Sequence, residues 1–127
     1  AREGRDVAHR RLATPRRVLL PNASAGVIRE SKTRGYVLNE GHTKNGGKAR
    51  FFAALGFTPD NWQEFEAALR EQHLSRDALE AGVNAEGRKW IIEAELNGPK
   101  GSARIRSVWF VPFDGDTPSF VTAYPDR

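Results

Sequence analysis

The chain has neither cysteine nor methionine among its 127 residues. Without cysteine there can be no disulfide framework and no metal site built on thiolates. Without methionine we expect the chain to be a processed or excised piece of a longer protein, because translation starts at methionine. No apolar run approaches the roughly 20 residues that cross a bilayer, so we expect no membrane-spanning segment.

The composition is that of one globular domain with an uneven distribution of charge. Hydrophobic residues make up 39% of the chain and charged residues 28%, enough for a single modest core. Up to Arg50 there are 12 Lys and Arg against 4 Asp and Glu, whereas the remainder has 8 against 12. A basic first half suits a polyanionic partner such as nucleic acid or an acidic protein. The alternative is a basic tail that only aids solubility.

The first half of the chain predicts helices behind a basic lead-in. We interpret residues 1–23 as the lead-in or linker, with a short strand at 17–20, and residues 24–127 as the folded domain. The spacing of apolar residues predicts helices over 24–38 and 47–55.

A third helix is predicted to begin at Thr58, which is a suitable N-cap and is followed by proline at the first helical position. We expect one further helical turn at 75–81. Two histidines are assigned no chemistry. His9 lies beside arginines and is interpreted as a surface residue, and His73 as a structural imidazolium that favours the dipole at the end of the third helix.

After Gly87 the spacing of apolar residues changes from the helical period to a period of two residues. Alternating apolar positions predict three strands, at about 90–96, 103–111 and 119–124, joined by turns at 97–101 and 112–118. Helices followed by an antiparallel β-meander predict a single α+β domain whose helices pack on one face of the sheet.

The densest group of chemically useful side chains lies at residues 39–50. His42 is suited to proton transfer near neutral pH, and Lys48 and Arg50 fall in the first turn of a predicted helix, where free N–H groups attract phosphate. The spacing does not fit a P-loop, because Ala49 stands where a hydroxyl would bind magnesium. The alternative is a glycine-rich helix entry with solvated charges.

The predicted sheet adds polar side chains to one face. Arg104 and Arg106 project the same way from their strand, and Thr122 and Tyr124, at alternate positions with Phe120, fall beside them if the last strand is the neighbour. Guanidinium groups on such a face are suited to binding phosphate.

Glu93 and Glu95 offer a structural alternative for the two arginines, namely pairing across the hairpin. The carboxylates of the chain are scattered without the spacing of metal ligands, so we predict no metal and no cofactor. A histidine, cations and hydroxyls suit metal-free RNA cleavage, in which a ribose 2′-OH attacks its own phosphate. The predicted catalytic residues are His42, Lys48, Arg106, Thr122 and Tyr124, and the predicted RNA-contacting residues are Lys44, Arg50, Arg104 and Arg34.

Four segments also carry a resemblance, at residues 36–42, 47–58, 103–109 and 118–124. Together they resemble an uncharacterised bacterial domain family found at the C-termini of polymorphic toxins and as small stand-alone proteins beside a presumed antidote. The histidine context departs from that family, which usually has Asn-Pro-x-His-Pro where this chain has Asn39-Glu-Gly-His42-Thr, so both prolines are missing. The order of helices, sheet and polar residues is similar to the barnase–EndoU–colicin–RelE superfamily of ribonuclease toxins.

The resemblance implies a toxin domain at the end of a longer delivery protein, secreted or presented at the cell surface and acting in the cytoplasm of a target cell. It also implies an RNA substrate, such as tRNA or another structured RNA, and a cognate immunity protein that is acidic. Two other classes remain as alternatives. One is a toxin enzyme such as a nucleotide-dependent transferase that transfers ADP-ribose, and the other is a non-catalytic module that binds RNA or protein.

Overall fold

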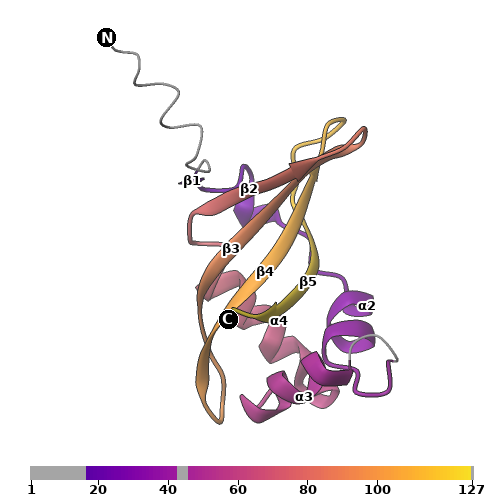
Figure 1. The fold of residues 1–127 in the computed structure, drawn as a ribbon, viewed down its shortest axis with the longest axis vertical. Coiled ribbons are helices and arrows are strands. Elements are labelled where there is room, and N and C mark those ends of the chain that lie inside the picture. Colours follow the sequence, from indigo (N-terminus) through magenta and orange to yellow (C-terminus); the bar gives the residue numbers. More distant parts are fainter. Residues whose placement is uncertain (1–16, 43–45, 127) are drawn as a thin grey trace.

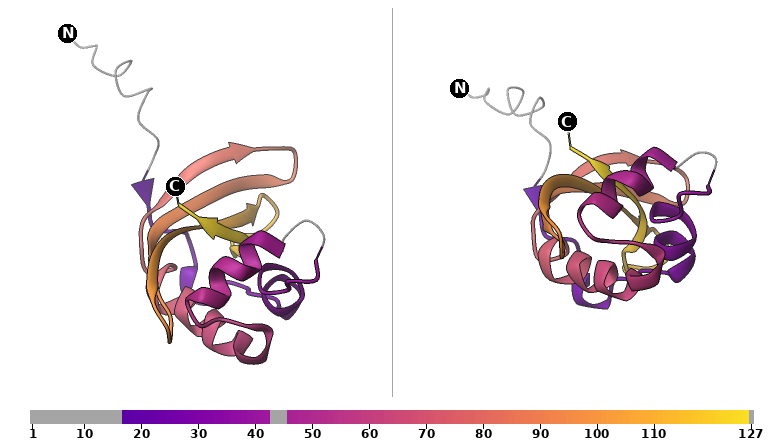
Figure 2. Two further views of the ribbon diagram at one scale, coloured as in Figure 1. Left: turned by 60° about the horizontal axis from the view of Figure 1, so that its bottom comes forward. Right: turned by 90° about the horizontal axis from the view of Figure 1, so that it is seen from below.

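The computed structural model describes residues 17–42 and 46–126, and it confirms the α+β fold (Figure 1). Within these residues five antiparallel strands form one sheet in the order β1-β2-β3-β4-β5. The helices gather on one side of this curved sheet (Figure 2). His9, Lys44 and most of the lead-in lie outside the described residues. The elements are β1 (Arg17–Val18), η1 (Ala23–Ala25), α2 (Glu30–Lys32), η2 (Thr33–Val37), α3 (Gly46–Ala54), η3 (Pro59–Asn61), α4 (Trp62–Gln72), β2 (Ala78–Val83), β3 (Gly87–Asn97), β4 (Ser102–Pro112) and β5 (Ser119–Pro125).

The two long strands β3 and β4 supply much of the core through their predicted alternation. Trp90 lies opposite Trp109, and Ala94 lies opposite Ile105. All four side chains are buried on the face that the helices cover. The period of two in the sequence therefore predicted both strands and their inward face correctly.

The helix that packs beneath the sheet begins as predicted. The Thr58 hydroxyl accepts a hydrogen bond from the Asp60 N–H at 3.3 Å, and Asn61 Oδ1 accepts one from the Thr58 N–H at 2.7 Å. This reciprocal cap satisfies donors that the first turn leaves free, so η3 and α4 start without loss of hydrogen bonds. Phe65 of α4 is fully buried and packs edge-on against Phe52 of α3.

The β3–β4 hairpin packs against the chain that leaves α3. Gly56 has a φ of 100°, a conformation that favours glycine, and it ends the helix as predicted. The Lys100 N–H donates to the Leu55 carbonyl at 2.9 Å. A Cβ at Gly98 would lie only 2.2 Å from the same carbonyl oxygen, so this close approach requires glycine.

Two predicted helical segments are wrong. Residues 75–81 were expected to be helical, but residues 78–83 form β2, because Leu79 pairs with both Arg17 and Ile91 and tertiary pairing prevails over local preference. Residues 24–38 do not form one helix. The chain is extended at Val27, whose N–H donates to the Pro118 carbonyl at 2.8 Å, and helix begins only at Glu30.

The lead-in enters the fold earlier than residue 24. β1 pairs with β2, near the predicted strand at 17–20, and Leu20 is a buried member of the core. None of the helices in residues 17–42 and 46–126 is both long and apolar enough to cross a membrane.

His73 is structural, but the prediction that it is charged is wrong. Its ring is buried between Ser107 Oγ, 2.7 Å from Nδ1, and the Ala94 carbonyl, 3.2 Å from Nε2. A carbonyl only accepts, so Nε2 carries the proton and Nδ1 accepts from the Ser107 hydroxyl, which in turn accepts from Trp109 Nε1. Burial lowers the pKa of His73 from 6.5 to about 4, and the ring is neutral at pH 7.

Candidate functional site

A short turn after η2 carries the histidine predicted to transfer protons. The His42 N–H donates to the Asn39 carbonyl at 3.1 Å, and Asn39 Oδ1 accepts from the Gly41 N–H at 2.9 Å. The half-buried imidazole packs edge-on against the ring of Tyr36, with 4.8 Å between the ring centroids. The turn and η2 therefore fix the backbone of His42 and one side of its ring.

Lys48, in the first turn of α3, joins the helical layer to the sheet. Its Nζ donates to Thr122 Oγ1 at 3.4 Å. The same ammonium lies 5.2 Å from the ring centroid of Tyr36 and 6.0 Å from that of Tyr124. We call His42, Tyr36, Lys48, Thr122 and Tyr124 the Lys48 cluster.

A β-bulge in β5 determines which of its side chains reach this cluster. Phe120 pairs with Trp109, but the next pair along is Thr122 with Val108, so one extra residue interrupts the strand. Phe120 therefore packs in the core with Trp109. Thr122 and Tyr124 lie on the other face of the sheet, and strict alternation from Phe120 was the wrong expectation.

Arg106 borders the cluster and is already paired. It lies opposite Tyr124 on the neighbouring strand, and its Nε is 2.9 Å from a Glu93 carboxylate oxygen and 3.1 Å from one of Asp126. Desolvation lowers the pKa of Arg106, but the two carboxylates and Tyr124 outweigh this and raise the pKa above its ordinary value. Arg104 pairs with Asp126 at 2.8 Å. Both arginines are therefore paired with carboxylates, as the structural alternative expected. Arg106 pairs with Glu93 across the hairpin, whereas the partner of Arg104 is Asp126.

Arg34 and Arg50, two of the other predicted RNA-contacting residues, lie outside the cluster. Arg34 pairs with Glu30 one turn earlier, at 2.9 Å, and both side chains are exposed. Arg50 is exposed two residues after Lys48 on α3, a spacing that places it on a different face of the helix. Lys44 lies outside the described residues.

Positive charge nevertheless gathers on the segments that frame the cluster. From Arg29 to Thr58 the described residues contain five Lys and Arg against two Asp and Glu, a balance of +3. The described residues after Thr58 contain seven against twelve, a balance of −5. A polyanion would therefore be attracted to the side of the domain built by α2, η2 and α3.

Sequence reasoning missed Tyr36 and Asp126 as neighbours of the site. Tyr36 begins the segment that ends in His42, and an aromatic residue beside a histidine loop was an available signal. Asp126 carried no signal, because its proximity to Arg104 and Arg106 depends on the pairing of β5 with β4.

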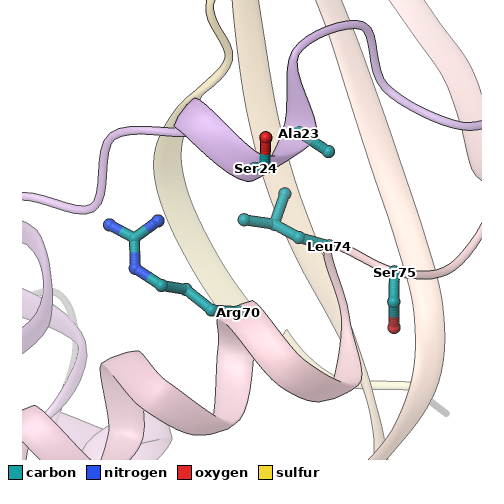
Figure 3. Close-up of a pocket in the computed structure, with 5 residues that line it drawn as sticks. All are labelled: Ala23, Ser24, Arg70, Leu74 and Ser75. Atoms are coloured by element: carbon teal, nitrogen blue, oxygen red, sulfur yellow. The ribbon is translucent and has the colours of Figure 1, made fainter.

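A metal site and a surface hollow were considered as other candidate sites. No group of three or more His, Cys, Asp or Glu side chains that could hold a metal ion occurs in the part of the chain that the structure describes. A hollow of about 300 Å³ lies between η1 and the end of α4, lined by Ala23, Ser24, Leu74 and Ser75 with Arg70 at its side (Figure 3). Arg70 is engaged there, because it donates to the Gly26 carbonyl at 2.8 Å and pairs with Glu66.

Fold and site together define a small α+β domain with a histidine and a lysine held near β5, the last strand of its sheet. The chain belongs to the family described as domain of unknown function DUF6883, whose model matches residues 19–127. No curated protein and no solved structure matches the chain.

Proposed function

We propose that this domain is a metal-independent endoribonuclease and that the Lys48 cluster is its active site. The observation that carries the proposal is the position of Lys48, whose ammonium lies among Tyr36, Thr122 and Tyr124 while His42 packs against the same Tyr36 ring. A proton-transfer group and a cation held together are what transphosphorylation of RNA requires.

In the proposed reaction the ribose 2′-OH attacks the adjacent phosphorus. A base removes the proton of the 2′-OH, the new O–P bond forms, the P–O5′ bond breaks, and an acid protonates the departing O5′. His42 serves in one of these two proton transfers. Lys48 binds the non-bridging oxygens, where negative charge increases in the transition state.

The remaining predicted residues take supporting roles in this proposal. Thr122 orients Lys48 through their hydrogen bond, and Tyr124 contacts both Lys48 and Arg106. Arg106 contributes positive charge beside the phosphate, although Glu93 and Asp126 offset part of it. In this proposal Arg106 therefore serves mainly to position Tyr124, and Lys48 supplies most of the positive charge at the phosphate.

The biological setting belongs to the same proposal. We place the domain at the end of a longer delivered protein, secreted or cell-surface presented, that cleaves tRNA or another structured RNA in the cytoplasm of a target cell. An acidic immunity protein would neutralise it. The support is the sequence resemblance to polymorphic toxins together with the positive charge of the segments that frame the cluster. That charge suits both an RNA and an acidic protein.

The experiment is incubation of the purified domain with total cellular RNA in EDTA, resolved on a denaturing gel. We expect discrete fragments that end in 2′,3′-cyclic phosphate. His42→Ala should retain the fold, as judged by circular dichroism, and lose cleavage. Intact RNA after incubation with folded native protein would contradict the proposal, as would full cleavage by His42→Ala.

A further inference from the structure

Tyr36 contacts two chemical groups that come from different parts of the chain. Its ring lies 4.8 Å from the His42 ring, with an angle of 83° between the planes. It also lies 5.2 Å from Lys48 Nζ, within the range of cation–π attraction. The imidazole and the ammonium are therefore held against one half-buried aromatic ring.

The backbone that presents Tyr36 is itself firmly anchored. η2 is a π-helical turn, in which the Leu38 N–H donates to the Thr33 carbonyl at 2.9 Å, five residues back. Thr33, Val37 and Leu38 are buried, so the turn is tied into the core on both sides of Tyr36. Single π-helical turns are rare and occur often at functional sites. This turn holds Tyr36 against the core, where its ring is half-buried.

The sheet contacts the Lys48 ammonium as well, through strand β5. Tyr124 and Thr122 contact the Lys48 ammonium from β5, whereas Tyr36 contacts it from the helical layer. Lys48 is thus held between two layers that come from distant parts of the sequence. Among these three neighbours of Lys48, Tyr36 is the one that also packs against His42.

We propose that Tyr36 is a positioning residue, which holds Lys48 and His42 at a fixed separation so that a phosphate bound by Lys48 lies within reach of the imidazole. This inference rests on the proposed ribonuclease function. The aromatic ring is the feature that makes both contacts. Tyr36→Phe should therefore act like the native protein, and Tyr36→Leu should not.

The test compares native protein, Tyr36→Phe and Tyr36→Leu in two measurements. In steady-state RNA cleavage, Tyr36→Leu should lower kcat/KM about tenfold, with a higher KM because Lys48 is less well held, and Tyr36→Phe should stay within about twofold of native. In NMR spectra, the His42 ring protons and the Lys48 ε-methylene protons should shift in Tyr36→Leu and not in Tyr36→Phe, because the ring current is lost only in the first.

Trp62→Leu is the matched control, since Trp62 is a half-buried aromatic that packs against the core from α4. It should keep native kcat/KM and both NMR signals. Equal losses in Tyr36→Phe and Tyr36→Leu, unchanged signals in Tyr36→Leu, or an equal loss in Trp62→Leu would overturn the inference. If native protein cleaves no RNA, the proposed function fails, and the NMR comparison still tests separately whether the Tyr36 ring lies against both His42 and Lys48.

Discussion

Acidification below pH 6.5 should destabilise the fold through His73. The ring is buried and neutral, with both nitrogens hydrogen-bonded, and burial lowers its pKa in the folded protein to about 4. In the unfolded chain the imidazole titrates near 6.5. The folded pKa is the lower of the two, so the stabilisation is complete above pH 6.5 and is lost as the pH falls toward 4.

The size of the effect follows from the pKa difference. Each unit corresponds to about 1.4 kcal/mol, so the fall from 6.5 to about 4 removes about 3 kcal/mol of unfolding free energy. A domain of this size has typically about 5–15 kcal/mol in total, so the loss is large.

The assay is urea unfolding at several pH values between 7 and 4, followed by the fluorescence of the buried Trp90 and Trp109. His73→Gln is the matched variant, because its amide can accept from Ser107 and donate to the Ala94 carbonyl without titrating. Native protein should lose about 3 kcal/mol more than His73→Gln over this range. Equal pH dependence in the two proteins would refute the assignment of a buried, neutral imidazole.

Two further substitutions test the packing and the site, each with a matched control. Gly98→Ala should lower the unfolding free energy by about 2 kcal/mol in chemical denaturation, because its Cβ would meet the Leu55 carbonyl oxygen at 2.2 Å, whereas Gly101→Ala finds ordinary contact at 3.9 Å and should stay near native. A native-like Gly98→Ala would contradict the close packing of the hairpin. Lys48→Ala should slow RNA cleavage about 100-fold, measured under single-turnover conditions, whereas Lys100→Ala, which removes an exposed lysine in the β3–β4 turn, should have little effect. Equal effects of these two lysine substitutions would indicate that only net charge matters.

Local patterns predicted much of the fold because local chemistry determines it. The cap at Thr58, the glycine at the end of α3 and the alternation in β3 and β4 depend on residues close in sequence. The helix predicted over 75–81 failed because β2 is formed by pairing with β1 and β3, which comes from distant segments.

The candidate site was predicted only in part. The types of residue and the neighbouring strands placed Lys48, Thr122 and Tyr124 together, as the structure does. Two features could not be predicted. The contact of the Tyr36 ring with both His42 and Lys48 depends on a π-helical turn. The pairing of Arg106 with Asp126 depends on the strand pairing that brings Asp126 beside β4.

The most direct test of the account uses an RNA that native protein cleaves, compared with the same RNA carrying a single 2′-deoxy nucleotide at the cleaved position, both in EDTA. We predict that the all-ribose RNA yields a 2′,3′-cyclic phosphate end and that the substituted RNA remains intact at that position. Equal cleavage of both RNAs would contradict attack by the ribose hydroxyl, and with it the proposed chemistry of the Lys48 cluster.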